Sequence, residues 1–308
     1  IVQPLSGRKD GQHFRATLKI GDKVIASATV DASLDLSPAC SLHIPSPELH
    51  LWEPGNPFLY DLSFELLDQN GLIIDTASGY AGMRSVSIQG KRLLINGKPL
   101  FQRQVLDQGF YPDGIMTAPD DNALKGDIEL ALAAGFNSAR LHQKLFEERF
   151  LYHADKLGYL VWGEFGDWGV HRKSESFSTI DPWGHHPHNA FFRQWTEALE
   201  RDYNHPSIVG WCPLNETHRF PDGSEDEINA LDDLTWGLYL VTKAIDPSRP
   251  VLDSSGYSHR VPGADVYDSH NYTQDPGQFA TEMNGEKPYV NPRFVQTPYL
   301  EQPYFCSE

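Results

Sequence analysis

N-H-P-S-I-V-G-W-C-P-L-N-E occupies residues 204–216, and it indicates the architecture more clearly than any other part of the chain. A helical pattern over residues 189–203 leads into it, and Pro206 ends that pattern because proline cannot continue a helix and restricts the residue before it. Residues 208–214 are almost wholly apolar, which is typical of a parallel strand buried on both faces. The strand ends on Asn215 and Glu216. The sequence therefore predicts a carboxylate at the C-terminal end of a buried strand, where barrel enzymes place their reactive groups.

Other predicted strands also end on polar residues. On their own, Asn215 and Glu216 are equally consistent with the start of an ordinary loop. However, Glu164, Arg140 and Glu308 each lie at the end of another apolar run. Because the carboxyl ends of parallel strands meet on one face, we expect these side chains to converge there.

Strand and helix patterns alternate through residues 85–308. Helices are predicted at residues 121–134, 147–157, 189–203 and 228–245, and strands at 136–141, 159–162, 208–214, 251–253, 266–269 and 303–306. This order predicts a parallel α/β domain, and the polar strand ends favour a (β/α)8 TIM-type barrel over a doubly wound sheet. No glycine-rich dinucleotide or phosphate-binding motif follows any of these strands, and we expect no cofactor.

Residues 1–84 have the patterning of an all-β domain. Polar and apolar residues alternate over 15–19, 24–30 and 59–67, and D-Q-N-G at 68–71 is a hairpin turn with glycine where a positive φ is needed. Short strands punctuated by glycine, proline and aspartate predict an immunoglobulin-like sandwich. A chain of 308 residues is also long for one core, so two domains are expected, at 1–84 and 85–308.

Composition excludes several classes of partner. The formal net charge of -17 argues against nucleic acid and anionic membranes, which attract basic surfaces. No apolar run approaches the ~20 residues of a membrane helix, and no signal-peptide pattern is present. Cys40, Cys212 and Cys306 are widely spaced and odd in number, which favours a reducing compartment, so we expect a cytoplasmic protein. Cys212 and Cys306 are interpreted as small core residues rather than nucleophiles.

Two polar segments are candidates for metal binding. H-H-P-H at residues 185–188 lacks a matching carboxylate or a second histidine pair, and the acidic residues 222–227 lack the spacing of a calcium loop. We therefore expect no metal site.

Several motifs together resemble glycoside hydrolase family 2, which includes β-galactosidases, β-glucuronidases and β-mannosidases. The stretch at 205–216 resembles the acid/base signature of that family. Further similarity lies, in the family's order, in L-W-E-P-G-N-P-F-L-Y (51–60), G-M-R (82–84), L-I-N-G-K-P-L (94–100), A-G-F-N-S-A-R (134–140) and H-A-D-K-L-G-Y-L-V-W-G-E (153–164). The resemblance covers nearly the whole chain.

This resemblance implies a retaining exo-β-glycosidase that acts by double displacement. Glu216 corresponds to the acid/base and Glu308 to the nucleophile, which requires two carboxyl groups about 5 to 5.5 Å apart. Arg140 resembles the arginine beside the nucleophile, although a surface salt bridge is the alternative for this residue. Asn215 resembles the asparagine that binds the sugar 2-hydroxyl.

Four further residues are candidates for binding the carbohydrate substrate. Glu164 is expected either to bind a hydroxyl or to pair with Arg140. Tyr272 resembles a tyrosine that donates to the nucleophile, and ordinary packing is an equal alternative for His270 and Tyr272. Trp168 is a candidate platform for stacking against a sugar ring.

The chain departs from the family pattern at two loops, V-L-D-Q (105–108) and L-H-Q-K (141–144), which shape the sugar pocket. A β-galactoside is therefore expected only because the family uses it commonly. Because Glu308 is the last residue, the sequence predicts a barrel that is incomplete after its seventh strand. The alternative is a non-catalytic or degenerate carbohydrate-binding member. Exposed core at the ends would favour association into a homo-oligomer.

Overall fold

A computed structural model describes residues 10–33, 37–167, 187–217, 225–257, 259–285, 287–290 and 296–308. The chain divides into two compact units, Ile1–Met83 and Arg84–Glu308. Within the described ranges, no helix combines the length and the apolar character needed to cross a membrane.

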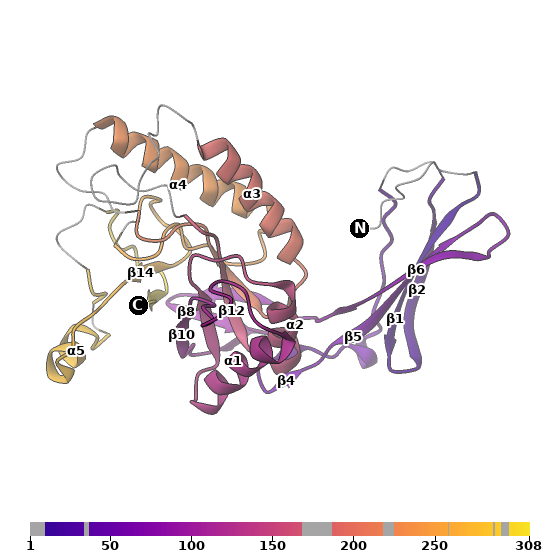
Figure 1. Ribbon diagram of the computed structural model, residues 1–308, viewed down its shortest axis with the longest axis horizontal. Coiled ribbons are helices and arrows are strands. Elements are labelled where there is room, and N and C mark those ends of the chain that lie inside the picture. Colours follow the sequence, from indigo (N-terminus) through magenta and orange to yellow (C-terminus); the bar gives the residue numbers. More distant parts are fainter. Residues whose placement is uncertain are drawn as a thin grey trace. The chain divides into compact units, whose positions relative to one another are not determined.

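The first unit is built on a four-stranded antiparallel sheet in the order β2-β1-β5-β6 (Figure 1). Its strands are β1 (His13–Ile20), β2 (Lys23–Asp31), β5 (Tyr60–Leu67) and β6 (Ile73–Ala81). Three short elements come between β2 and β5 in the chain. They are a 3-10 helix, η1 (Ser46–Glu48), and the two-residue strands β3 (Trp52–Glu53) and β4 (Asn56–Pro57).

The predicted hairpin between β5 and β6 is confirmed. Gly71 has a φ of 80°, which favours glycine, and the Asp68 carboxylate accepts hydrogen bonds from the Asn70 and Leu72 amides. The prediction of a β-rich N-terminal region is therefore confirmed. The described strands of this unit form one main sheet, so the sandwich remains a prediction.

The second unit begins with a small antiparallel sheet of β7 (Val86–Gln89), β8 (Arg92–Ile95) and β9 (Lys98–Pro99). A parallel sheet follows, with β10 (Gln104–Asp107), β11 (Ser138–Leu141), β12 (Leu160–Glu164) and β13 (Ile208–Cys212) adjacent in chain order. Strands β11, β12 and β13 are fully buried, and for β13 this confirms the burial on both faces that its apolar sequence predicted.

Two glycine–tryptophan pairs fix the packing between β12 and β13. Trp162 lies opposite Gly210, and Gly163 lies opposite Trp211. A Cβ atom at Gly210 would lie 2.4 Å from the Trp162 ring, and one at Gly163 would lie 2.5 Å from the Trp211 ring. Each indole therefore occupies space that any larger residue on the neighbouring strand would fill.

Helices separate the parallel strands, as predicted. They are α1 (Asp121–Ala133), α2 (Glu148–Leu157), α3 (Pro187–Asp202) and α4 (Glu225–Ile245), with a shorter α5 (Pro276–Glu282) near the C-terminus. The Asp120 side chain caps α1, and Gly158 ends α2 with a φ of 72°. Helices α3 and α4 lie side by side, and the Trp195 indole donates to Thr242 between them (Figure 1).

The parallel arrangement continues beyond β13. Parallel bridges join Trp211 to Val251 and Asn215 to Ser255, so this segment runs alongside β13. Strands β14 (Tyr267–Ser269) and β15 (Tyr304–Cys306) then pair in parallel. The parallel α/β architecture is confirmed, whereas the sheets formed by the described residues do not close into a ring.

Candidate active site

The polar residues that follow successive parallel strands meet at one place. Arg140 lies on β11 and Glu164 ends β12, while Asn215 and Glu216 follow β13. Residues after β14 and β15 complete the group with His270, Tyr272 and Glu308. The common strand direction predicted this convergence, and the contacts below show it.

Arg140 is the central cation of the site and is almost completely buried. Its Nε and NH2 groups donate to the Glu164 carboxylate at 2.7 and 3.0 Å. Its NH2 also donates to Asn215 Oδ1, and its NH1 donates to Glu308 Oε1 at 2.8 Å. Burial lowers the pKa of Arg140, but the Glu164 carboxylate outweighs that effect and the net pKa is raised. The guanidinium therefore stays charged and fixes three neighbours.

Glu164 lies behind the site. Its side chain is shielded from solvent, and besides both bonds from Arg140 it accepts from the Gln143 amide at 3.0 Å. Burial raises its pKa, against the opposing charge of Arg140. Of the two roles expected from the sequence, pairing with Arg140 is the one that these contacts support.

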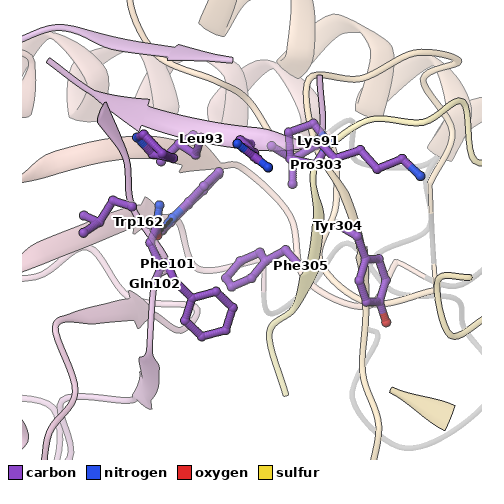
Figure 2. A pocket seen from close by; sticks show the side chains of 12 residues that line it. Lys91, Leu93, Phe101, Gln102, Trp162, Pro303, Tyr304 and Phe305 are labelled. Atoms are coloured by element: carbon purple, nitrogen blue, oxygen red, sulfur yellow. Dashed lines mark hydrogen bonds between the residues drawn. The ribbon is translucent and has the colours of Figure 1, made fainter. Parts of the chain in front are cut away.

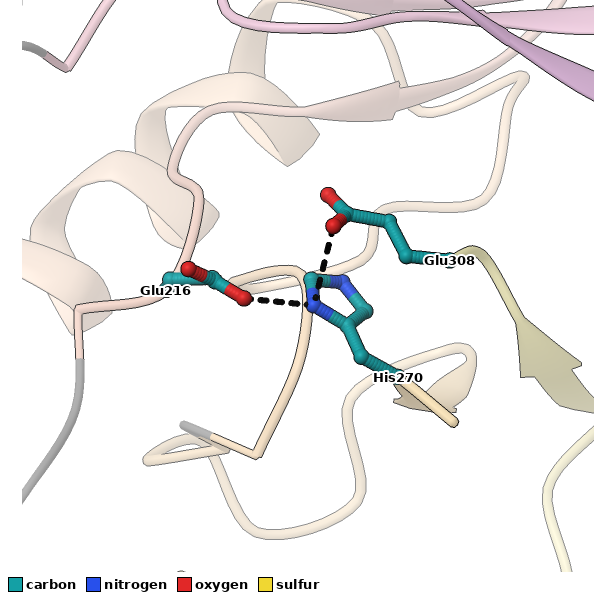
Figure 3. Close-up of side chains that lie close together, drawn as sticks. All are labelled: Glu216, His270 and Glu308. Carbon is teal, nitrogen blue, oxygen red and sulfur yellow. Dashed lines mark hydrogen bonds and ion pairs between the residues drawn. The ribbon is translucent and has the colours of Figure 1, made fainter. Parts of the chain in front are cut away.

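Glu216 adopts a strained backbone conformation with a φ of 50°. Its amide donates to the Ser255 carbonyl at 2.9 Å, which holds this residue beside the parallel segment that follows β13. Its Oε1 lies 2.7 Å from His270 Nδ1 (Figure 3). The carboxyl group is one-third exposed and so stays accessible to a ligand. Strain of this kind is common at functional sites.

Glu308 approaches the same imidazole from the end of β15. Its Oε2 lies 3.5 Å from His270 Nδ1 and accepts a hydrogen bond from the Tyr272 hydroxyl. Burial and this bond to Glu308 raise the pKa of Tyr272, so the hydroxyl remains a donor. Ligand atoms of Glu216, His270 and Glu308 all lie within 4.8 Å of one another. The two carboxylates are thus neighbours.

His142, from the loop after β11, is a site residue that the sequence did not single out. Its Nε2 lies 3.5 Å from Glu308 Oε1, and its Nδ1 lies 3.4 Å from Gln108. Burial, together with the nearby Arg140 charge, lowers the pKa of His142 to about 4. The imidazole is therefore neutral near pH 7. The only sequence signal was that this loop departs from the family pattern.

Metal and cofactor chemistry were not expected from the sequence. Glu216, His270 and Glu308 are of residue types that ligate divalent cations. However, the 2.7 Å between Glu216 Oε1 and His270 Nδ1 is also the length of a direct hydrogen bond, which needs no cation between the two groups. The histidines at 185 and 186 lie outside the described residues.

The structure brings together most of the predicted site residues, namely Glu216, Glu308, Asn215, Arg140, His270 and Tyr272, with Glu164 behind them. Trp168 lies outside the described residues. Cys212 is buried beside the site, where burial raises its pKa well above that of an ordinary thiol. Burial also raises the pKa of Cys306 to about 11. The raised pKa values favour the packing role expected for both thiols.

Known proteins resemble both units. Residues 6–84 match the family described as Glycosyl hydrolases family 2, and residues 86–301 match the Glycosyl hydrolases family 2, TIM barrel domain. A β-galactosidase of Vibrio vulnificus strain YJ016 is 32% identical over 222 residues, which are 71% of this chain and 20% of that relative. A β-glucuronidase of Paenibacillus borealis is 29% identical over 210 residues, or 65% of this chain and 33% of the relative.

Solved structures share the fold. The β-D-glucuronidase of Dictyoglomus thermophilum superposes with a TM-score of 0.71 at 23% identity, covering 90% of this chain and 45% of that structure. The chain spans about a fifth of the length of the β-galactosidases that it matches.

Proposed function

The chain belongs to glycosyl hydrolase family 2, and from this membership we propose that it carries the active site of a retaining exo-β-glycosidase. In this proposal Glu216 is the acid/base and Glu308 is the nucleophile. The observation that carries it is their separation. Oxygen atoms of the two carboxylates lie within 4.8 Å of each other. That spacing suits double displacement, which uses carboxyl groups about 5 to 5.5 Å apart, rather than inversion, which needs about 6.5 to 9.5 Å.

The reaction then has two steps. Glu308 attacks the anomeric carbon while Glu216 gives its proton to the departing glycosidic oxygen, and a glycosyl ester forms on Glu308. In the second step Glu216 takes a proton from water, the oxygen of that water attacks the anomeric carbon, and the Glu308 carboxylate leaves. Arg140 and Tyr272 donate to Glu308, so they orient the attacking carboxylate and stabilise it when it departs.

The substrate we propose is a terminal β-galactoside or a closely similar neutral sugar. Among the described residues, Arg140 is the buried cation at the centre of the site, and it already binds Glu164, Asn215 and Glu308. A carboxylate on the sugar would lie close to Glu216 and Glu308, and the described residues at the centre of the site provide no cation dedicated to it. Because Asn215 accepts from Arg140 through Oδ1, its amide NH2 group remains to donate to the sugar 2-hydroxyl.

We also propose that the second domain, residues 85–308, supplies strands of a (β/α)8 TIM-type barrel and that residues 1–84 form an immunoglobulin-like sandwich. Strands β10 and β15 are edge strands in the described sheets. A cavity of about 410 Å³ lies beside β15 and beside the residues that precede β10, and its lining includes Phe101, Trp162 and Phe305 (Figure 2). Most of its lining is apolar, although Lys91 and Arg92 also contribute, and this suits a strand packed between β15 and β10.

Turnover of nitrophenyl β-glycosides tests the catalytic proposal. The panel comprises the nitrophenyl galactoside, glucuronide, glucoside and mannoside, together with the phenyl β-glycoside of each sugar as the substrate with a poor leaving group. Loss of the general acid in Glu216→Gln should lower turnover of substrates with poor leaving groups by about 10² to 10⁴-fold. Azide should restore activity only where the leaving group needs no protonation.

Glu197→Gln is the matched control, because Glu197 lies on α3 with its side chain 66% exposed. Equal activity of Glu216→Gln and wild type would refute the assignment of Glu216. No turnover of any substrate by the wild-type protein would favour a non-catalytic carbohydrate-binding member instead.

A further inference from the structure

We infer that His270 is a positioning residue: its imidazole carries a proton on Nδ1, which holds Glu216 Oε1 and so directs the transferable proton to Oε2. The inference rests on the proposed function, because it assigns a task to the acid/base of that reaction. From the sequence, His270 was a candidate for contacting the sugar. Its burial is complete, so the side chain faces protein groups rather than a ligand.

One ring nitrogen of His270 faces only groups that can accept a proton. Nδ1 lies 2.7 Å from Glu216 Oε1 and 3.5 Å from Glu308 Oε2 (Figure 3). The Tyr272 hydroxyl is 3.4 Å away, and it accepts there because its own proton goes to Glu308. An N–H at Nδ1 therefore has a carboxylate at hydrogen-bond distance.

The other ring nitrogen, Nε2, has two possible donors within 3.5 Å, whereas the Asp268 carboxylate lies farther away, at 4.0 Å. Arg140 NH1, which can only donate, lies 3.5 Å from Nε2. Ser255 Oγ lies 2.8 Å from Nε2 and can supply its hydroxyl proton. A proton on Nε2 would point toward the guanidinium N–H of Arg140, which disfavours the tautomer with its proton on Nε2 alone. These contacts together favour an N–H group at Nδ1.

The surrounding backbone holds the ring in this orientation. Gly256 has a φ of 88°, and a Cβ atom there would lie 3.1 Å from His270 Cε1 and 3.4 Å from Glu216 Cγ. The Gly256 amide and the Ser307 hydroxyl both donate to Asp268 Oδ2, at 2.9 and 2.8 Å. The ring is therefore packed closely against the Gly256 backbone.

This placement has a chemical consequence in both steps. When Glu216 is the acid, the Nδ1–H bond occupies Oε1, so the proton that passes to the glycosidic oxygen sits on Oε2. When Glu216 is the base, Oε1 still accepts from Nδ1 and Oε2 takes the proton from water. His270 gives up no proton in either step. Loss of the His270 imidazole should therefore slow proton transfer by Glu216, whereas the attack by Glu308 should be much less affected.

Substrates of graded leaving-group ability separate this role from a merely structural one. A dinitrophenolate leaves without protonation, whereas a phenolate needs the acid. In His270→Phe, which keeps an aromatic ring but has no N–H, kcat/KM for the phenyl β-glycoside should fall at least about 30-fold further than kcat/KM for the dinitrophenyl β-glycoside. Azide should accelerate the variant with the dinitrophenyl substrate, as expected for Glu216→Gln.

Two conservative variants complete the test. The side-chain nitrogen of asparagine lies as many bonds from Cβ as Nδ1 does, so His270→Asn should recover about tenfold of the lost phenyl activity by again donating to Glu216. In glutamine the nitrogen corresponds to Nε2, so His270→Gln should not. An equal fall with both substrates in His270→Phe, or equal recovery by asparagine and glutamine, would overturn the inference.

These experiments distinguish failure of the inference from failure of the proposed function. The proposed function fails if wild type is inactive or if Glu216→Gln matches it. The inference fails alone if Glu216→Gln shows the dependence on leaving group and His270→Phe does not. Activity that is lost with a chelator and restored by a divalent cation would also overturn it, because a metal ligand must present a lone pair at Nδ1 instead of a proton.

Discussion

Arg140 binds Glu164 through two hydrogen bonds, at 2.7 and 3.0 Å, in a pair whose side chains are both shielded from solvent. The guanidinium extends from this pair to Asn215 and Glu308. The buried pair therefore fixes the cation that holds two other groups of the site. Stability and the proposed activity consequently depend on the same contacts.

Removing one partner of this pair should destabilise the second unit. Arg140→Met leaves Glu164 as an unpaired buried carboxylate, which should cost about 3 to 5 kcal/mol in the free energy of unfolding. Urea unfolding followed by tryptophan fluorescence measures the change. The matched control is Arg149→Met, because Arg149 pairs with Asp121 at the surface and its side chain is 62% exposed. The control should lose no more than about 1 kcal/mol. Equal losses would contradict the structural role of the buried pair.

A methyl group at Gly256 should disturb the site. Gly256→Ala combines a positive φ with a Cβ atom that meets the His270 ring, so we expect a loss of about 1 to 3 kcal/mol in unfolding free energy and a lower kcat. Gly90→Ala is the control, because Gly90 has a φ of 58° and no atom within 4 Å of its added Cβ. That variant should show only the cost of the backbone conformation. If the control were impaired as much in kcat, crowding at His270 would not be the cause.

His142 should make the protein less stable in acid. Burial and Arg140 hold its pKa at about 4 in the folded state, below the ordinary 6.5. The unfolded chain therefore binds this proton first, and the stabilisation present above pH 6.5 is lost as the pH falls toward 4. At pH 5 the loss is about 2 kcal/mol. Unfolding of wild type and His142→Asn at pH 7 and pH 5 should show a smaller pH dependence for the variant. Parallel behaviour of the two proteins would rule out this contribution.

Cys212 should be inert toward alkylating reagents in the folded protein. It is 1% exposed, and burial raises its pKa far above that of a free thiol. Iodoacetamide should modify Cys40, which is partly exposed, before Cys212. Peptide mapping by mass spectrometry distinguishes the two sites. Rapid labelling of Cys212 without unfolding would contradict its placement in the core.

Local pattern was enough to predict most of the second unit. Hydrophobic periodicity and end signals located α1, α2 and the strand at 208–212 to within a few residues, because the period of burial and the capping groups lie within each segment. Polar residues after buried strands also pointed to Glu216 and Glu308, since a common strand direction brings those ends to one face.

The finer arrangement of the site depends on contacts that no local pattern encodes. Glu216 meets His270 across 54 positions of sequence, and Arg140 meets Glu308 across 168. The sequence could not show that Glu164 is shielded behind Arg140, or that His270 faces two carboxylates. Both depend on how neighbouring strands and their loops pack, and on Gly256 leaving room for the imidazole. Composition and periodicity thus fixed the elements and their direction, because burial and backbone preference act within a segment. The pairing of charges was decided in three dimensions, because hydrogen bonds form between whichever groups the packed strands bring within about 3 Å.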